Sequence, residues 1–462
     1  MKQCLCILVT ACLLLGLCAC SDTTEVESPL KVGFGRVDVT PDYSVGLGGY
    51  GDAATRRSTG VADYLFVTCI AITEGEETVL MLTADTLGLG GTNLVSFRSF
   101  VSSATGIAQD KIFVGATHSH SAPDLSIGDE QCVKYKGLLF GGAAEAALAA
   151  LEDRAPATLR ATTTDVPGMT FVRHYKMADG SYAGSNFGSF TTTTPVDYAT
   201  ESDPQMVLVQ FDRTGDKKDI LMMNWQSHPD RSHQIGETLL SASFVGPARS
   251  KLEQTSGMLV AYFTGASGNL NPDSRISSHM HNLSWKDYGV ALAGYAQDAL
   301  KDLKSVEGSG IQTTRTKLTV EIDHSWDHMV DKANQVYHLW QTESKAAGDA
   351  LGRTYGFSSS YQARMIRLRS TMFPTEQLEI NACRVGGIGF VNGTYEMFSD
   401  AGLYIKRNSP YEITFVISGN HTYIPSAAAY DYRSYEADTS LYTKGTAEKL
   451  AEEFVSMLKA IQ

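Results

Sequence analysis

Short apolar runs rich in β-branched residues alternate with longer amphipathic stretches along almost the whole chain from Lys31 onward. The apolar runs predict strands at residues 65–72, 78–84, 111–116, 205–211, 220–225, 258–264, 317–322, 387–391 and 412–417. Helical periodicity predicts helices at residues 93–104, 133–151, 285–303, 326–346, 396–407 and 446–460. This alternation is typical of α/β proteins, so we predict a parallel or mixed central sheet flanked by helices.

No internal repeat or low-complexity linker divides this pattern. We therefore predict one large domain over residues 31–462, although this length exceeds the usual size of a single core. Residues 324–371 are charged and helical in pattern, and we predict that they form an insertion over one end of the sheet.

Composition and charge exclude several classes of protein. The chain of 462 residues is 43% hydrophobic and 19% charged, which excludes a disordered or collagen-like protein. Its 38 basic and 51 acidic residues give a net charge of −13. Because nothing in the chain suggests a concentrated basic face, we expect no nucleic-acid partner. No obligate protein partner is evident either.

The N-terminus has the pattern of a sorting signal. Lys2 precedes an apolar run at residues 4–17, and Leu17-Cys18-Ala19-Cys20 resembles a bacterial lipobox, in which the final cysteine is lipidated. We predict a signal peptide at residues 1–19, a tether at 20–30 and a lipid anchor at Cys20 in the envelope of a Gram-negative cell. The alternative is a buried N-terminal helix. Of the eight cysteines only Cys69, Cys132 and Cys383 lie beyond this segment, which excludes a disulfide scaffold.

Glycine-rich segments offer weaker functional signals. Gly33-Phe34-Gly35 and Gly88-Leu89-Gly90-Gly91 lack the third glycine of a dinucleotide-binding motif, so we expect tight turns there. Gly265-Ala266-Ser267-Gly268 resembles a nucleophile elbow, but Asn269 replaces the last glycine. A serine hydrolase of that type is therefore disfavoured.

Histidines at strand ends point instead to a metal site. His118 and His120 follow the predicted strand 111–116, and strand alternation places both side chains on one face. His228 follows the strand 220–225, and Glu396 follows the strand 387–391 at the start of a predicted helix. Ligands of α/β proteins bind at such carboxyl ends, and zinc prefers these side chains. A second pair, His279 and His281, lies in a polar segment, where we expect it to be solvated.

Several short motifs follow one another along the chain: Gly35-Arg36-Val37-Asp38-Val39-Thr40-Pro41 with Gly48-Gly49-Tyr50, Thr117-His118-Ser119-His120-Ser121-Ala122-Pro123, Asn224-Trp225-Gln226-Ser227-His228, Glu396-Met397-Phe398 with Gly402-Leu403, and Val416-Ile417-Ser418-Gly419 with Tyr423 and Tyr435-Glu436. In this order, from about Gly33 to Leu458, they resemble the motifs of the neutral, non-lysosomal ceramidase family of zinc-dependent amidohydrolases. The resemblance implies a ceramidase-like catalytic domain.

The resemblance also implies roles for individual residues. His118, His228, Glu396 and Tyr423 correspond to the zinc ligands of the family, and His120 would face the substrate beside the metal. Arg173 corresponds to an arginine that helps to bind the reacting carbonyl region, and Tyr435 would be a further hydrogen-bond donor.

Two departures from the family pattern concern the substrate. Asn271, in Gly268-Asn269-Leu270-Asn271-Pro272-Asp273, stands at the position of an active-site serine. The chain also ends soon after Tyr435, so we expect the family's C-terminal β-sandwich domain to be absent. The pattern suggests the same hydrolysis on a substrate other than ceramide.

Two hypotheses follow for the function. The first is a zinc-dependent hydrolase of an amide or ester bond, with metal-activated water as nucleophile and an N-acylated lipid or acylated sugar as substrate. In it Arg173 and Tyr435 stabilise the oxyanion, His120 shuttles a proton, and Asn271 orients the substrate. The second is a non-catalytic envelope lipoprotein that binds lipid or glycan in a degenerate pocket. Retention of the whole presumed ligand set argues against it, because a binding module needs no open zinc position.

Overall fold

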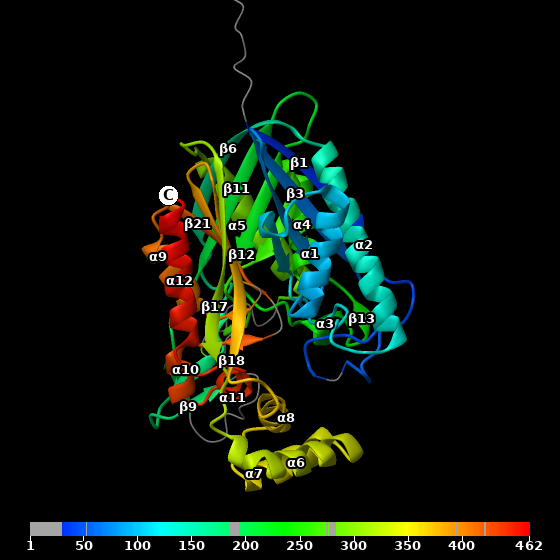
Figure 1. The fold of residues 1–462 in the computed structure, drawn as a ribbon, viewed down its shortest axis with the longest axis vertical. Coiled ribbons are helices and arrows are strands. Elements are labelled where there is room, and N and C mark those ends of the chain that lie inside the picture. Colours follow the sequence, from blue (N-terminus) through cyan, green and yellow to red (C-terminus); the bar gives the residue numbers. More distant parts are fainter. Residues whose placement is uncertain are drawn as a thin grey trace, which may run out of the picture.

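The computed structural model describes residues 30–51, 53–184, 194–273, 276, 283–393, 395–419 and 422–462. In these residues two stacked sheets lie between layers of helices (Figure 1). The mixed α/β fold predicted from the sequence is therefore confirmed. Within the described residues, no helix has the length and apolar character needed to cross a bilayer.

The larger sheet is mixed, with parallel pairs only near its two edges. Its strands run in the order β14-β12-β11-β6-β1-β3-β4-β5, and β16 pairs with β6 at one side. The β12–β14 and β4–β5 pairs are parallel, and the other pairs are antiparallel. The strands are β1 (Leu30–Asp38), β3 (Phe66–Glu74), β4 (Glu77–Ala84), β5 (Ile112–Ala116), β6 (Ala155–Asp165), β11 (Gln205–Arg213), β12 (Ile220–Trp225), β14 (Leu259–Thr264) and β16 (Lys304–Ser305).

The smaller sheet has the order β17-β18-β19-β21 and packs face to face on the larger one. Its β19–β21 pair is parallel. The strands are β17 (Ile311–Glu321), β18 (Thr375–Val385), β19 (Ile388–Gly393) and β21 (Ile413–Ile417). Side chains from both sheets, Phe113 and Phe263 from one and Phe390 and Phe415 from the other, share one buried core. Such burial on both faces explains why these strands read as continuous apolar runs.

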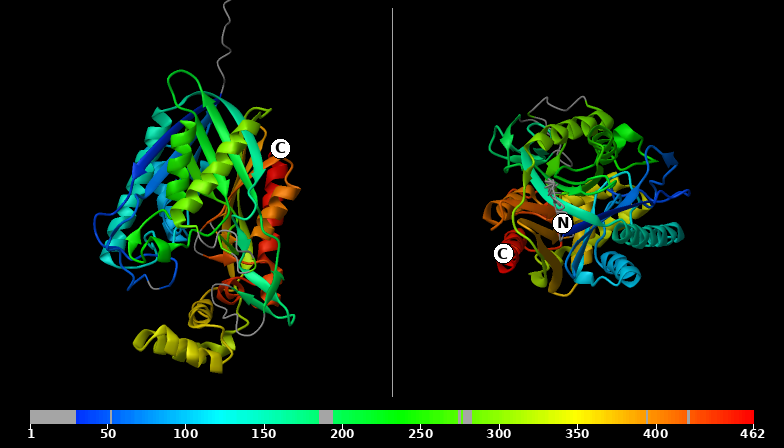
Figure 2. Two further views of the ribbon diagram at one scale, coloured as in Figure 1. Left: turned by 180° about the vertical axis from the view of Figure 1, so that it is seen from behind. Right: turned by 90° about the horizontal axis from the view of Figure 1, so that it is seen from above.

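Helices cover the outer face of each sheet. The larger sheet is covered by α1 (Thr92–Thr105), α2 (Glu130–Glu152), α4 (Val245–Ser256) and α5 (Trp285–Ala299), and the smaller sheet by α9 (Ser399–Asn408) and α12 (Thr446–Ala460). Figures 1 and 2 show these layers from three directions.

The expected turn at Gly33 and Gly35 is wrong, because both glycines lie inside β1. A Cβ at Gly33 would lie 2.0 Å from the carbonyl oxygen of Ala150, and one at Gly35 would lie 2.0 Å from that of Ala146. Both carbonyls belong to α2, so the glycines allow this helix to lie directly on the strand.

A cluster of helices lies beyond one end of the two sheets (Figure 1). It consists of α6 (Val330–Thr342), α7 (Lys345–Thr354) and α8 (Ser360–Arg369), and it has a small core of its own that includes Val336, Phe357 and Ile366. The predicted helix at 326–346 is divided, because Ser344 caps α7 by accepting a hydrogen bond from the Ala347 amide at 3.1 Å. We call this unit the α6–α8 cluster; that it is an insertion stays a prediction.

Short elements connect the layers around the same end of the sheets. They are β2 (Gly60–Val61), β7 (Phe171–Val172), β8 (His174–Met177), β9 (Tyr182–Gly184), β10 (Pro195–Tyr198), α3 (Ser232–Ile235), β13 (Leu239–Leu240), β15 (Leu270–Asn271), β20 (Glu396–Met397), β22 (Tyr423–Ile424), α10 (Ala427–Asp431) and α11 (Tyr435–Thr439). Single 3-10 turns lie elsewhere along the chain, at Gln109–Lys111, Leu300–Asp302 and Asp327–Met329.

Candidate metal centre

Each proposed ligand follows the carboxyl end of a strand that belongs to one of the parallel pairs. His118 follows β5 and His228 follows β12 in the larger sheet, while Glu396 follows β19 and Tyr423 follows β21 in the smaller one. Glu396 does not start a helix as expected. It lies in β20, which pairs in parallel with β22 in the register Glu396↔Tyr423, so the two side chains are neighbours.

His118 and His120 lie together, but not because of strand alternation. β5 ends at Ala116, and His118 has a left-handed backbone with φ 65°. The amide of His118 donates to the Thr86 carbonyl at 3.1 Å, and that of His120 to the Pro229 carbonyl at 3.1 Å. The ring centroids of the two histidines are 5.2 Å apart.

Backbone carbonyls fix the tautomers of two histidines. Nδ1 of His118 lies 2.7 Å from the Leu87 oxygen, and Nδ1 of His228 lies 3.0 Å from the Ser267 oxygen. Because a carbonyl can only accept, each Nδ1 carries a proton and donates. In the neutral rings the Nε2 lone pairs are then available to a metal, and they face each other.

The ligand atoms of His118, His228 and Glu396 have the spacing of a small cation site. The two Nε2 atoms are 3.2 Å apart, and Oε2 of Glu396 lies 3.3 Å from the first and 3.5 Å from the second. Ligand bonds of about 2.0–2.2 Å at tetrahedral angles place ligand atoms about 3.3–3.6 Å apart. The residues present therefore fit a tetrahedral metal.

Electrostatics in this site also favour a cation. Oε2 of Glu396 is buried and has no hydrogen-bond partner among the described residues. Burial by itself would lower the pKa of His118, but the Glu396 carboxylate outweighs burial and raises the pKa. Conversely, burial opposes ionisation of Glu396, but the two imidazoles hold the pKa of this carboxyl far below its usual value. Positive charge between these side chains is thus stabilised.

His120 stands close enough to be a further ligand. The ligand atoms of His118, His120 and His228 all lie within 4.8 Å of one another, and each of the three residues is buried. Burial, together with the neighbouring His118 and His228, lowers the pKa of His120 well below the ordinary value on which the predicted shuttle role rested. At pH 7 His120 is therefore neutral, so it can supply a proton to another group only after it has first taken one up.

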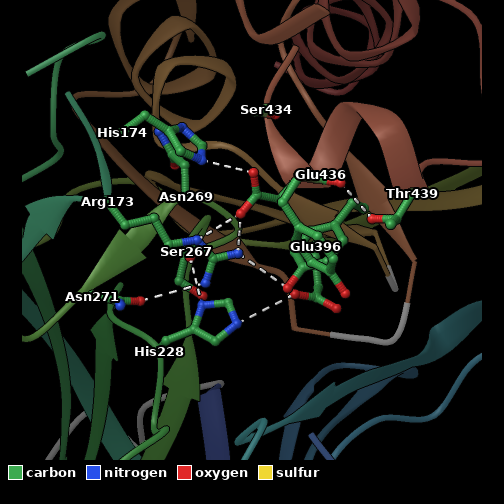
Figure 3. Close-up of polar contacts among 12 residues, drawn as sticks. Arg173, His174, His228, Ser267, Asn269, Asn271, Glu396, Ser434, Glu436 and Thr439 are labelled. Carbon is green, nitrogen blue, oxygen red and sulfur yellow. Dashed lines mark hydrogen bonds and ion pairs between the residues drawn. The ribbon is translucent and has the colours of Figure 1, made fainter. Parts of the chain in front are cut away.

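Arg173 contacts two of the other residues predicted for the site, Tyr423 and Asn271. Its Nη2 donates to the Tyr423 hydroxyl at 3.1 Å, and its Nη1 donates to Oδ1 of Asn271 at 3.4 Å. The antiparallel pair β7–β15, with Asn271 opposite Phe171, brings Asn271 beside it. Figure 3 shows the contact between Arg173 and Asn271 and the Glu396 carboxylate beside His228.

Glu436 holds Arg173 in place, and the sequence reasoning assigned it no role. It is fully buried; its Oε1 accepts from Nε of Arg173 at 2.7 Å, and its Oε2 lies 2.7 Å from Nε2 of His174 (Figure 3). Burial would raise the pKa of Glu436, but Arg173 and His174 lower it, so the residue stays ionised. The sequence signal that could have indicated a role for Glu436 is its position next to Tyr435 in the motif Tyr435-Glu436, which resembles the family.

Tyr50 is a second residue for which no role was predicted. Its ring packs edge-on against His120 with the centroids 5.1 Å apart, and its hydroxyl donates to the Asp230 carbonyl at 2.7 Å. A Cβ on the preceding Gly49, whose φ is +105°, would lie 2.3 Å from Cγ of His120. The motif Gly48-Gly49-Tyr50 thus forms one wall around this histidine.

A cavity of about 940 Å³ opens onto these residues. His118, His120, Glu396, Tyr423, Arg173, Asn271 and Tyr435 line it on one side. Tyr361, Arg364, Met365 and Leu368 line it on the other, and their spacing places them on one face of α8. The α6–α8 cluster is therefore a wall of the candidate site. His279 and His281 lie outside the described residues.

Comparisons with known proteins agree with this arrangement. The sequence profile described as "Neutral/alkaline non-lysosomal ceramidase, N-terminal" matches residues 30–272. No curated protein matches the sequence significantly.

Two solved structures have a similar fold. Neutral ceramidase from Pseudomonas aeruginosa has a TM-score of 0.69 at 15% identity, over 94% of this chain and 74% of that one. A structure described as ceramidase complexed with C2 has a TM-score of 0.68 at 15% identity, over 94% and 75% of the two chains. At such identity the likeness concerns the fold, while the profile covers more than half of the chain. The protein belongs to the neutral/alkaline non-lysosomal ceramidase family.

Proposed function

We propose that the protein is a zinc-dependent hydrolase of an amide or ester bond in an acylated substrate. The observation that carries this proposal is the tetrahedral spacing of Nε2 of His118, Nε2 of His228 and Oε2 of Glu396 at the wall of a large cavity. Family membership supports hydrolysis as the reaction class.

Zinc is the metal that this donor set suits best. Two imidazoles and a carboxylate are frequent ligands of both zinc and iron(II). The 90° angles of an octahedral iron site would place neighbouring ligand atoms about 2.8–3.1 Å apart, and two of the three spacings here, 3.3 and 3.5 Å, lie in the tetrahedral range instead. Zinc at this point would activate water and polarise the carbonyl of the substrate. We propose Tyr423 as a fourth ligand, since it neighbours Glu396.

The other residues have roles that follow from their contacts. Arg173 is held by Glu436 and presents its guanidinium to the cavity, where it can bind the developing oxyanion of the reacting carbonyl. Burial raises the pKa of Tyr435, so its hydroxyl keeps its proton and can donate to the same oxygen. His120 is neutral and can take up the proton of the attacking water before passing it to the leaving group.

Asn271 occupies the place of the family serine and serves to orient the substrate. Its amide oxygen already accepts from Arg173 at 3.4 Å, and its side chain lines the cavity. An amide is no nucleophile, so Asn271 can act only through hydrogen bonds.

The cavity suits an acyl-bearing substrate with a polar part. Leu87, Met365 and Leu368 provide apolar surface, while Asp124 and Asp230 provide polar groups. Its volume lies within the range of about 300–1,000 Å³ common for ligand sites. An N-acylated lipid or an N- or O-acylated sugar presents both surfaces.

A substrate screen tests this proposal. The zinc-loaded protein is offered N-acyl lipids, N-acetyl sugars and O-acyl esters, and release of the free acid is measured. We expect turnover that a chelator abolishes and zinc restores, and that His118→Ala lacks. Turnover that resists complete metal removal, or the absence of turnover on every class, would contradict the proposal.

We also propose that the protein is held at the cell envelope by a lipid on Cys20. The support is the lipobox-like run Leu17-Cys18-Ala19-Cys20. The signal peptide, the tether and Cys20 all lie outside the described residues.

A further inference from the structure

The contacts of Arg173 leave one of its donors available to a substrate. Nε and Nη2 both reach Oε1 of Glu436, at 2.7 and 2.5 Å, and Nη2 also donates to the Tyr423 hydroxyl at 3.1 Å. Nη1 donates one of its two N–H groups to Oδ1 of Asn271 at 3.4 Å. A guanidinium has five N–H groups, so one N–H of Nη1 has no partner among the described residues. Its direction depends on the plane of the guanidinium, which the Glu436 carboxylate determines.

His174 in turn determines how the Glu436 carboxylate lies. Oε2 of Glu436 lies 2.7 Å from Nε2 of His174. Because Glu436 is ionised, Oε2 can only accept, so Nε2 of His174 carries a proton and donates. His174 thus occupies one carboxylate oxygen, and both donors of Arg173 meet the other. Without this bond the carboxylate could turn about its Cγ–Cδ bond, and the guanidinium would turn with it.

Two aromatic rings and one hydroxyl hold His174. Its ring lies between those of Tyr432 and Phe398, with the centroids 5.5 and 5.7 Å away. The hydroxyl oxygen of Tyr432 lies 3.0 Å from Nδ1 of His174. Burial raises the pKa of Tyr432, so its hydroxyl keeps the proton and can donate to Nδ1 of the neutral ring. Tyr432, His174, Glu436 and Arg173 therefore form one continuous chain of hydrogen bonds.

The local fold explains how two consecutive residues reach the same carboxylate. Neighbouring side chains of a strand point to opposite faces. The strand is interrupted at Arg173, between β7 and β8, so Arg173 and His174 both turn towards Glu436. Figure 3 shows these two contacts. Arg173, His174 and Glu436 are 1%, 3% and 0% exposed, so bulk water does not compete for these bonds.

The outer end of the chain lies away from the large cavity. Neither His174 nor Tyr432 is among the described residues that line this cavity. On the far side of Tyr432, the ring of Tyr182 in β9 stacks on it with the centroids 4.9 Å apart, and Tyr182 is 43% exposed. An effect of Tyr432 on a substrate in the cavity therefore has to pass through Arg173.

We propose that His174 and Tyr432 are positioning residues, which act through Glu436 to aim the free Nη1–H of Arg173 at the oxyanion of the substrate. The inference rests on the proposed function, because it assigns these residues a part in the hydrolysis. The alternative is that Glu436 only neutralises the buried charge of Arg173. Neutralisation requires the carboxylate but neither His174 nor Tyr432, so variants of these two residues separate the alternatives.

Rates of full-length variants give the first test. Tyr432→Phe removes one hydroxyl and keeps the ring, and it should lower kcat roughly twofold to tenfold, the value of one hydrogen bond. His174→Phe removes a bond to a charged group and should lower kcat roughly 10- to 100-fold. His174→Gln, whose amide nitrogen can replace Nε2 as donor, should recover most of that loss. Zinc content should stay at the wild-type level in all three.

Tyr430→Phe is the matched control and should keep the wild-type kcat. Tyr430 lies two residues before Tyr432, and its hydroxyl donates to the Tyr442 carbonyl at 2.7 Å. A double-mutant cycle adds the decisive comparison: in an Arg173→Lys background, Tyr432→Phe should cause no further loss, because the guanidinium through which it acts is gone. The same fold loss in both backgrounds, or equal losses in Tyr432→Phe and Tyr430→Phe, would overturn the proposal.

A second readout needs no turnover. Hydrogen exchange at Nε of Arg173, followed by NMR of the ¹⁵N-labelled protein, should be slow in the wild type and in Tyr430→Phe. It should be at least about tenfold faster in His174→Phe and measurably faster in Tyr432→Phe, which decides if His174→Phe does not fold. Unchanged exchange in Tyr432→Phe would overturn the positioning role alone. Absence of turnover in the wild type would contradict the proposed function, whatever the exchange rates are.

Discussion

At the scale of single residues, the proposed metal centre depends on two backbone carbonyls as much as on its proposed ligands. The oxygens of Leu87 and Ser267 keep the Nδ1 protons of His118 and His228 in place, and the Nε2 lone pairs are directed inward as a result. Neither carbonyl has a side-chain signature, so the sequence could predict the histidines but not their tautomers.

The replacement of the family serine by Asn271 gives a prediction about rates. His118→Ala should abolish turnover, because it removes a metal ligand. Asn271→Ala should cost roughly 10- to 100-fold in kcat/KM, about 1.4–2.7 kcal/mol, because only a polar contact to substrate and Arg173 is lost. Asn271→Ser should restore part of the activity on ceramide-like amides. The measurement is a rate comparison of the three variants on the substrate that the screen returns.

Equal and complete loss of activity in His118→Ala and Asn271→Ala would contradict an orienting role for Asn271. The nearby substitution Asn269→Ala is not a suitable control. Oδ1 of Asn269 accepts a hydrogen bond from the Ser399 amide at 2.8 Å, so this side chain supports the fold.

Asp63 gives a prediction about stability and pH. Burial raises the pKa of Asp63 to about 6, although hydrogen bonds from the Ser241 hydroxyl and the Ala242 amide oppose this rise. In the unfolded state Asp63 has an ordinary pKa near 3.9, so the folded state binds the proton of Asp63 more tightly than the unfolded state does. Ionisation of Asp63 thus lowers the free energy of unfolding as the pH rises from about 4 to about 6.

Asp63→Asn should remove this loss and reduce the difference in unfolding free energy between pH 4 and pH 7 by about 1–3 kcal/mol. Urea unfolding at both pH values measures it, and Asp42→Asn, at an exposed position, is the control. A difference as large in Asp63→Asn as in the wild type would show that Asp63 does not cause this pH dependence.

At the scale of elements, α8 connects the α6–α8 cluster to the side chains of the candidate site. The hydroxyl of Tyr361 donates to the carbonyl of Tyr50, whose ring packs against His120. A Cβ on Gly51 would lie 2.3 Å from Cε1 of Tyr361, so the loop and the helix fit closely. The orientation of His120 therefore depends on a helix far away in the sequence.

Tyr361→Phe should accordingly lower kcat roughly twofold to tenfold, the value of one hydrogen bond, with little change in melting temperature. Tyr355→Phe is the matched control, because its hydroxyl donates to Gln335 within the same cluster at 2.7 Å instead of to the Tyr50 loop. If both variants lose activity equally, the cluster acts on the site through general stability and not through Tyr361.

Elements whose own residues carry a periodic pattern could be predicted from the sequence. Elements that exist only through pairing with another segment could not. β12 and α12 were predicted at the bounds observed, because a fully buried strand and an amphipathic helix carry their periodicity in their own residues. Glu396 was assigned to a helix because it precedes α9, but the two-residue strand β20 exists only through its pairing with β22. The strand β18 and the helix α4 were missed, since polar residues interrupt their apolar pattern. The helix α8 lies in the segment 324–371, which was predicted to be helical without bounds for this helix.

At the scale of the whole molecule, the sequence predicted the class of fold but not the second sheet. Nothing in the apolar runs of β19 and β21 indicates that these strands belong to a different sheet from β5 and β14. The stacking of the two sheets brings together histidines from one and Glu396 from the other. The convergence of strand ends could be predicted, whereas the pairing of two separate sheets is a tertiary property.

The location of the molecule gives a prediction that is independent of its fold. Cys20→Ala should lose the lipid anchor and leave the membrane fraction of cells, because the polar tether after it has no affinity for a bilayer. Fractionation followed by immunoblotting measures this, with Cys69→Ala as control, since Cys69 is buried in the core. Sedimentation of Cys20→Ala with membranes after a high-salt wash would contradict the lipid anchor.

The zinc content of the purified protein tests the central claim most directly. Elemental analysis after dialysis should find one zinc per chain in the wild type, and close to none in His228→Ala. His233→Ala should keep its zinc, because His233 lines the same cavity but takes no part in the three-histidine group. A wild-type protein without bound metal, or a His228→Ala variant that keeps its full zinc content, would contradict a metal centre built on His118, His228 and Glu396.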